Sequence, residues 1–234
     1  MSAPRAAIVT GGTGALGRAV VRRLLAAGTK VAVSYRRASE WHALEAAAGA
    51  PASLFGIEAE LADPAGAEAF VTRARERLGA LDGVALVAGG WAGGAPFHEA
   101  PPEEWTRMLR GNLDSAAFVC RAALPLLRAQ GGSIVAVGAR AAEHAGAGMA
   151  AYAVSKSALH ALVRVLAQEN RGHGVRVNAV LPGTIDTPAN RGAMKDALRS
   201  GWTAPERIAE VVAFLLSTES SATTGALVPV DAGG

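Results

Sequence analysis

The sequence predicts an α/β fold with a doubly wound, parallel, seven-stranded sheet and helices on both faces. Short apolar runs alternate with longer runs of helical periodicity along the whole chain. Most of the short runs are apolar on both faces, as buried parallel strands are. The connections are short, which places each helix against the sheet. Together these observations indicate a Rossmann-like arrangement in one domain covering residues 1–234.

Each element is expected from a specific run of residues. The strands are expected, in chain order, at 6–10, 30–35, 52–57, 83–88, 133–138, 175–181 and 226–230. The helical pattern covers 15–28, 64–79, 103–130, 152–170 and 204–218. Several helices stop at a glycine, namely Gly28, Gly79 and Gly131, as expected of left-handed C-terminal caps. The least regular part, 181–206, is predicted to be a substrate-covering segment.

Composition and charge exclude several classes of function. The net charge is +3 and the arginines are scattered, so no nucleic-acid partner is expected. Cys120 is the only cysteine, which excludes an internal disulfide and, with no second ligand at metal spacing, a metal site. No apolar stretch approaches the roughly 20 residues that span a bilayer. With no signal-peptide pattern at the start of the chain, a cytoplasmic protein without a membrane partner is expected.

A glycine-rich turn follows the first expected strand and opens the first helix. In such a turn the backbone approaches a pyrophosphate closely, and the helix N-terminus supplies N–H groups and a partial positive charge. The segment therefore predicts a dinucleotide site. Its expected binding residues are Gly11, Gly12, Thr13, Gly14, Ala15, Leu16 and Gly17.

The end of the second strand indicates which dinucleotide binds. NAD sites place a carboxylate there for the ribose hydroxyls, but this strand ends in Tyr35, Arg36 and Arg37, and the next carboxylate is Glu40. Two guanidiniums suit a 2′-phosphate, so NADPH is predicted, with NADH possible. Glu60 and Leu61, after the third strand, are candidates for the adenine pocket.

The order of these motifs resembles the short-chain dehydrogenase/reductase family over essentially the whole chain. The resemblance is carried by the glycine-rich turn, Asn112, the Tyr152-x-x-x-Lys156 pair and Pro182-Gly183. It implies that Tyr152 donates the proton, that Lys156 holds the nicotinamide ribose, and that Asn112 breaks its helix and holds a water. It also implies cofactor contacts from the turn after strand four and the start of the 181–206 segment: Ala88, Gly89, Gly90, Pro182, Gly183, Thr184 and Thr187.

The Tyr152–Lys156 pair makes chemical sense on its own spacing. A free tyrosine titrates near 10, too high for easy proton exchange at neutral pH. An ammonium four residues later lies on the same helical face and favours the phenolate. We therefore expect Lys156 to lower the pKa of Tyr152 towards the working pH.

Three departures from the usual family pattern point to one substrate class. Ala139 stands where the family has a serine, the turn after strand four reads AGGWAGG, and the later segment reads DTPANR. All three resemble quinonoid dihydropteridine reductases, a divergent branch of the family. A quinonoid dihydropterin is a conjugated imine-like acceptor, so hydride addition creates no localised alkoxide for a serine to stabilise. The expected reaction is reduction of such a flat conjugated imine.

The substrate side is expected to be lined by few residues. Trp91 offers an indole face to a planar bicyclic substrate. The expected substrate residues are Trp91, Ala139, His144, Met149 and Arg191, although Asp186 and Arg191 more readily pair with each other.

Two alternatives remain open. One is an NADPH-dependent ketone reductase in which another group replaces the serine; the other is a non-catalytic NADP-binding protein. In either case, the Ala- and Leu-rich helices at 103–129 and 151–170 predict a homodimer or homotetramer.

Overall fold

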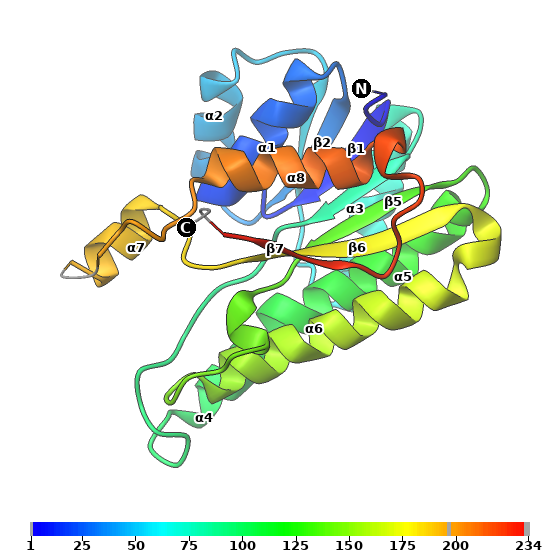
Figure 1. The fold of residues 1–234 in the computed structure, drawn as a ribbon. Helices are drawn as coiled ribbons and strands as arrows, with labels where there is room; N and C mark the ends of the chain where they lie inside the picture. Colours follow the sequence, from blue (N-terminus) through cyan, green and yellow to red (C-terminus); the bar gives the residue numbers. More distant parts are fainter. Residues whose placement is uncertain (1, 196–197, 232–234) are drawn as a thin grey trace.

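The computed structural model describes residues 2–195 and 198–231. All seven strands are parallel and lie in the order β3-β2-β1-β4-β5-β6-β7, as Figure 1 shows. The predicted doubly wound sheet is therefore confirmed. The strands are β1 (Ala6–Thr10), β2 (Lys30–Tyr35), β3 (Leu54–Glu58), β4 (Gly83–Leu86), β5 (Gly132–Val137), β6 (Val175–Pro182) and β7 (Leu227–Val230).

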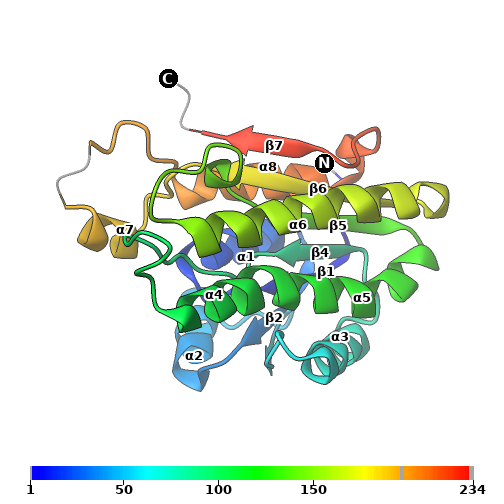
Figure 2. The same cartoon turned by 90° about the horizontal axis from the view of Figure 1, so that it is seen from below.

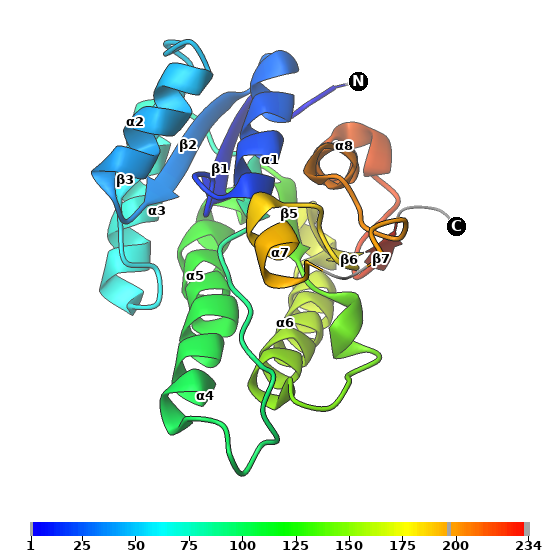
Figure 3. The ribbon, with the colours of Figure 1, turned by 90° about the vertical axis from the view of Figure 1, so that its left-hand side faces the viewer.

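Helices cover both faces of the sheet. In Figures 1 and 3, α1, α2 and α8 lie on one face, and α3, α5 and α6 lie on the other. Figure 2 views the second layer from below, with α4 leading into α5. The helices are α1 (Ala15–Ala26), α2 (Ala38–Ala47), α3 (Pro64–Leu78), α4 (Pro102–Leu109), α5 (Ser115–Arg128), α6 (Ala150–Glu169), α7 (Pro188–Ala193) and α8 (Pro205–Leu216).

The core consists of two apolar layers that share the strands. In β1, Ala6 and Ile8 pack towards α3, α5 and α6, whereas Ala7 and Val9 pack towards α1 and α8. All four side chains are buried, because successive side chains of a strand point to opposite faces and both faces are covered. The near-continuous apolar character of the strands thus follows from their central position.

Two strands differ from their predicted bounds for local reasons. The 83–88 run stops pairing at Leu86, because the N–H groups of Val87 and Ala88 both donate to the Thr10 hydroxyl at 3.1 Å. The 52–57 run begins at Leu54, whose N–H closes a turn on the Pro51 carbonyl, and it extends to Glu58. The other strands differ by no more than one residue at either end.

The helix predicted over 103–130 is interrupted, and the break at Asn112 that the family resemblance implies is confirmed. A five-residue π-helical segment, η1 (Arg110–Asp114), separates α4 from α5. Asn112 lies in this segment, and its side chain forms hydrogen bonds with the Gly90 backbone. The wider π-helical turn accommodates this contact. Two short helices, α2 and α7, are additional to the prediction; α2 buries only Trp41 and Leu44, too few to create a clear helical pattern.

The predicted left-handed helix ends are confirmed. Gly28, Gly79 and Gly131 have φ angles of 81°, 75° and 80°, a conformation that favours glycine. Within the predicted segment 181–206, residues 196–197 lie outside the described residues; the remainder contains α7 and a parallel bridge between Ile185 and Thr203. Of the helices in the described ranges, none combines the length and the apolar character needed to cross a membrane.

Candidate active site

The predicted site residues follow the carboxyl ends of the strands, where ligands bind in open α/β sheets. The glycine-rich turn follows β1, Arg36 follows β2 and Trp91 follows β4. Ala139 follows β5, and the 181–206 segment begins in the last residues of β6. Because the strands are parallel, these segments share one edge of the sheet.

The glycine-rich turn leaves no space for a side chain at three of its positions, Gly11, Gly12 and Gly17. A Cβ on Gly17 would lie 2.2 Å from the Gly11 carbonyl oxygen, and a Cβ on Gly11 would lie 2.7 Å from Ala88 Cα. The helix cap is the exposed Gly14, and α1 begins with small or apolar residues. The N–H groups in the first turn of α1 are therefore surrounded by small or apolar residues and have no acidic neighbour in that turn. This environment suits a pyrophosphate, so the turn fits the dinucleotide predicted from sequence.

The end of β2 carries a polar cluster that the sequence did not reveal. Arg37 donates to Glu40, whose carboxylate also accepts from the Thr13 hydroxyl at 3.3 Å in the glycine-rich turn. Arg18 donates to the Thr13 carbonyl oxygen at 2.8 Å and to the Glu40 carbonyl oxygen at 3.2 Å. The hydrogen bond from Arg37 lowers the pKa of Glu40, which keeps its carboxylate ionised at neutral pH.

The other predicted adenosine-end residues have defined contacts. The Tyr35 ring stacks on Trp41, with centroids 5.8 Å apart, and Arg36 is exposed. The Glu60 carboxylate accepts from the Ala62 N–H at 2.9 Å, and Leu61 is buried in the core. Leu61 therefore packs in the hydrophobic core, whereas Glu60, the residue before it, is exposed at this edge of the sheet.

Asn112 links the turn after β4 to helix α6. Its side chain is fully buried, accepts from the Gly90 N–H at 2.8 Å and donates to the Gly90 carbonyl at 3.1 Å. It also donates to the Ser155 hydroxyl at 3.0 Å, which in turn donates to the Tyr152 carbonyl. A Cβ on Gly89 would lie 2.5 Å from the Asn112 side-chain oxygen, so the glycine permits this close approach.

Lys156 and Tyr152 lie on α6, and their environments differ from the prediction. Lys156 is 5% exposed, donates to the Val137 carbonyl at 2.7 Å, and has its pKa lowered to about 8 by burial. Burial raises the pKa of Tyr152, so the predicted lowering by Lys156 is wrong for the protein alone. Desolvation of the phenolate outweighs the ammonium, which is held on the β5 carbonyl.

Ala139 is buried after Gly138, the residue that follows β5, and its N–H donates to the Nε2 atom of His160 at 3.3 Å. His160 is 4% exposed and was not expected in the site. The available signal was its spacing, because it lies four residues after Lys156 and so shares the buried face of α6.

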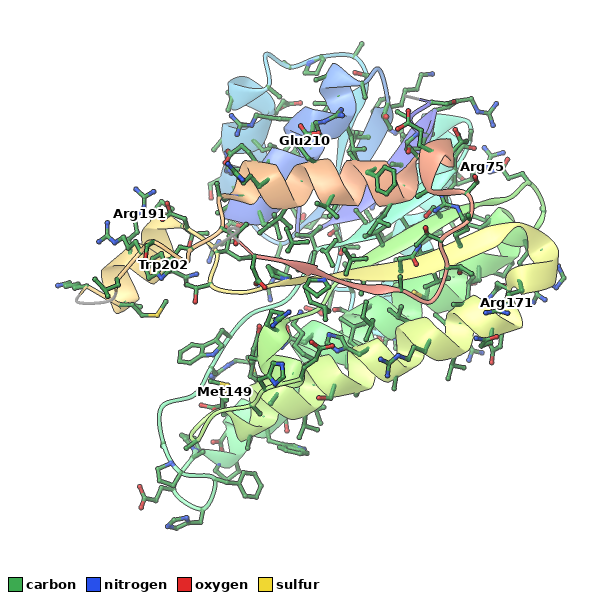
Figure 4. All side chains as sticks on the ribbon, in the orientation of Figure 1. Arg75, Met149, Arg171, Arg191, Trp202 and Glu210 are labelled. Carbon is green, nitrogen blue, oxygen red and sulfur yellow. The ribbon has the colours of Figure 1, made fainter. Side chains whose placement is uncertain are left out.

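Trp91 and Met149 come together, and His144 stays exposed. Trp91 is 61% exposed on the turn after β4, and the Gly94 N–H donates to the Gly148 carbonyl at 2.7 Å. A Cβ on Gly93 would lie 3.2 Å from the Trp91 ring and 3.4 Å from Met149 Cα, so both residues border the same turn. Figure 4 shows Met149 near the start of α6.

The 181–206 segment is organised by its own contacts. Asp186 and Arg191 form a two-bond ion pair at 2.5 and 2.6 Å, as expected, and Arg191 lies with Trp202 on the α7 side in Figure 4. The Thr187 hydroxyl caps α7 by accepting from the Asn190 N–H at 3.1 Å, and the Thr184 backbone carbonyl accepts from the Thr203 N–H at 2.8 Å. Arg191 borders a groove of about 410 Å³ together with Ala15 and Arg18, away from Met149.

The described residues form neither a cluster of metal ligands nor a reactive thiol. No group of three or more His, Cys, Asp or Glu side chains in residues 2–195 and 198–231 is placed to hold a metal ion. Cys120 is buried in α5, and burial raises the pKa of its thiol to about 12. The thiol is therefore protonated and packs as a small apolar group.

Comparison with known proteins gives similarity over the whole chain. The family described as enoyl-(acyl carrier protein) reductase matches residues 12–234. The chain is 30% identical over 239 residues to the 3-oxoacyl-(acyl-carrier-protein) reductase MabA of Mycobacterium tuberculosis (strain ATCC 25618 / H37Rv), covering 98% of this chain and 92% of that protein. It is 35% identical over 242 residues to the 4-formylbenzenesulfonate dehydrogenase TsaC1/TsaC2 of Comamonas testosteroni, covering 97% and 96%.

Solved structures also match this chain over almost its whole length. Levodione reductase superposes with a TM-score of 0.91 at 28% identity, covering 100% of this chain and 98% of that one. A short-chain oxidoreductase from Pseudomonas aeruginosa PAO1, described as containing an atypical catalytic center, superposes with a TM-score of 0.89 at 28% identity, covering 97% and 96%.

Proposed function

Because this chain belongs to the short-chain dehydrogenase/reductase family, we propose that it is an NADPH-dependent reductase that acts on a quinonoid dihydropterin or a similar flat, conjugated imine. Membership of the family makes the chain an oxidoreductase. The finer proposal rests on one observation. Ala139 stands at the sequence position where the family has a serine, whereas Tyr152, Lys156 and Asn112 are all present.

The chemistry of the acceptor explains why alanine suffices. A ketone becomes an alkoxide on reduction, and a hydroxyl donor at position 139 stabilises that charge. A conjugated imine takes hydride into a delocalised ring and then needs one proton. Tyr152 supplies that proton, and the exposed indole of Trp91 offers a flat face for the ring.

The chain's own residues prepare the proton transfer. NADPH supplies the hydride when bound, and the glycine-rich turn, Arg36, Arg37, Ala88 and Gly89 are the residues that would hold it. Lys156, whose pKa is about 8, is largely protonated at neutral pH. Asn112 fixes Gly90 and, through Ser155, the first turns of α6. Tyr152 is thereby held at the substrate side of the helix.

A carbonyl reductase is the second candidate, and the relatives favour it. The MabA proteins of Mycobacterium tuberculosis and Mycobacterium avium are named as 3-oxoacyl-(acyl-carrier-protein) reductases, which act on a carbonyl group. Oxidation of NADPH and of NADH should therefore be measured with freshly generated quinonoid dihydropterin, a 3-oxoacyl thioester and simple ketones. Fast turnover of the pterin supports the first proposal, and turnover of the thioester or ketones alone supports the second. Binding of NADPH without turnover of any acceptor would favour a non-catalytic role.

Replacing Ala139 by serine separates the two candidates. If the acceptor is a conjugated imine, Ala139→Ser should raise kcat/KM for simple ketones by about tenfold or more, because it restores an alkoxide donor. Turnover of the pterin should change little. Ala139→Val, which adds bulk without a hydroxyl, is the control. A fall in ketone turnover with both variants would show that position 139 acts by size alone.

Replacing Glu40 by glutamine tests the predicted preference for NADPH. The Glu40 carboxylate shares Arg37 with the expected 2′-phosphate, so removing its charge should raise the kcat/KM ratio of NADPH over NADH by about three- to tenfold. Glu45→Gln, one turn further along α2, is the matched control and should leave the ratio unchanged. An unchanged or lower ratio in Glu40→Gln would place the 2′-phosphate away from Arg37.

The protein is proposed to act in the cytoplasm as a homodimer or homotetramer. Val154 and Val165 are exposed on α6, and this apolar face is the surface on which a second copy is expected to pack.

A further inference from the structure

His160 and Lys156, both on helix α6, form hydrogen bonds with the backbone at the end of β5. Lys156 Nζ donates to the Val137 carbonyl at 2.7 Å, and His160 Nε2 accepts from the Ala139 N–H at 3.3 Å. The two side chains lie four residues apart on the buried face of α6. Helix α6 therefore binds the backbone on both sides of Gly138, where the strand turns into the wall of the site.

Gly138 is packed against the imidazole itself. A Cβ at this position would lie 2.3 Å from His160 Nε2 and 2.6 Å from Leu181 Cδ2. Any larger residue would displace the ring or the strand, so the glycine allows the backbone to lie directly on the histidine. The ring thus supports the position of Ala139 by contact as well as by its hydrogen bond.

The hydrogen bond requires a neutral imidazole. Nε2 accepts from an N–H group, so it carries no proton and the ring proton is on Nδ1. Burial lowers the pKa of His160 below 6.5; Glu143 opposes this, and Lys156 and Arg164 add to it. Protonation would place two donors against each other and break the contact with Ala139.

We propose that His160 is a positioning residue that fixes Ala139 and the Lys156 anchor on Val137 relative to Tyr152. This inference rests on the proposed reductase function. His160 is 4% exposed, so it acts through the Gly138–Ala139 backbone, which faces the acceptor in the proposed site, and not by contact with the acceptor itself. Without the His160 ring, the Gly138–Ala139 backbone loses this contact, and Ala139 shifts relative to Tyr152.

Two replacements separate the hydrogen bond from the volume of the ring. His160→Gln keeps a carbonyl acceptor within reach of Ala139 and cannot titrate, whereas His160→Leu fills the space without an acceptor. We expect His160→Leu to lower kcat by about ten- to a hundredfold, because small misplacements at a reacting centre are costly. His160→Gln should retain most of the wild-type kcat. The exposed His42→Leu is the control.

Binding and pH readouts distinguish positioning from general damage. The dissociation constant of 2′,5′-ADP, which probes the adenosine end, should be the same in all variants. As the pH falls below 6.5, the wild-type kcat should drop with the protonation of His160, and His160→Gln should lack this decline. If His160→Leu matches the wild type, or if both variants are equally impaired and His160→Gln keeps the acid limb, the inference is overturned.

A spectroscopic measurement covers the case in which the proposed function fails. A wild type that turns over no acceptor refutes the reductase proposal, and the contact is then judged by NMR of the ¹⁵N-labelled protein. The Ala139 amide resonance should shift in His160→Leu and stay in place in His160→Gln. A proton on Nε2 of wild-type His160 at neutral pH would overturn the inference whatever the activity.

Discussion

Tyr152→Phe should lower kcat by about 10²- to 10⁴-fold, because it removes the hydroxyl that we propose as the proton donor and leaves the ring packed in place. Burial already raises the pKa of this phenol, so the protonated form prevails up to alkaline pH. The variant should bind NADPH as the wild type does. Stopped-flow measurement of the loss of NADPH absorbance, with the acceptor in excess, isolates the chemical step.

The sequence offers a matched control, since it has only one other tyrosine. Tyr35→Phe keeps the stacking on Trp41 at the predicted adenosine end of the site, so any effect should fall on the KM for NADPH, and kcat at saturating NADPH should match the wild type. If Tyr152→Phe retained the wild-type rate, the proton would come from another donor, and the assignment of Tyr152 would have to be abandoned.

Gly17→Ala should lower stability and abolish tight nucleotide binding. Its Cβ would lie 2.2 Å from the Gly11 oxygen and 2.6 Å from Gly12 Cα, both backbone atoms, so α1 must move away from the turn. Overpacking of this kind costs about 1–3 kcal/mol, which corresponds to a fall in Tm of about 2–12 °C. The Kd for NADPH should rise at least about tenfold, because displaced N–H groups no longer converge on the phosphates.

Gly14→Ala is the control for this change. A Cβ at Gly14 meets the Gly11 oxygen at 3.5 Å, an ordinary contact, so thermal unfolding should occur at the wild-type Tm. Differential scanning fluorimetry with and without NADPH reports both quantities. An unchanged Tm in Gly17→Ala would mean that the turn is more plastic than its packing indicates.

The fold could be predicted because its signals are local. A strand buried on both faces produces an apolar run, and a glycine at a left-handed helix end marks a boundary, so the order of elements follows from short windows. The break at Asn112 could be suspected from Gly111-Asn112 within a helical pattern. Its π-helical form depends on Gly90 and Ser155, which are distant in sequence.

For the candidate site, the sequence allows a prediction where the spacing of two residues alone implies their relation. Tyr152 and Lys156 share a helix, so their relation can be deduced, but the pKa of Tyr152 depends on burial by distant segments. The contacts of Glu40 with Thr13 and of His160 with Ala139 join residues 27 and 21 positions apart. Only the packing of α2 and α6 against the sheet creates them.

The order of strands in the sheet also has a consequence for biosynthesis. Strand β1 lies between β2 and β4, and β4 pairs Gly83 with Ala7 only after the intervening elements have been made. The Thr10 hydroxyl then receives the N–H groups of Val87 and Ala88, which completes the glycine-rich turn. Helix α6 leaves the ribosome later still. The elements of the nucleotide half are thus synthesised before Tyr152, and until β5 is available the edge of β4 is free to pair with other chains.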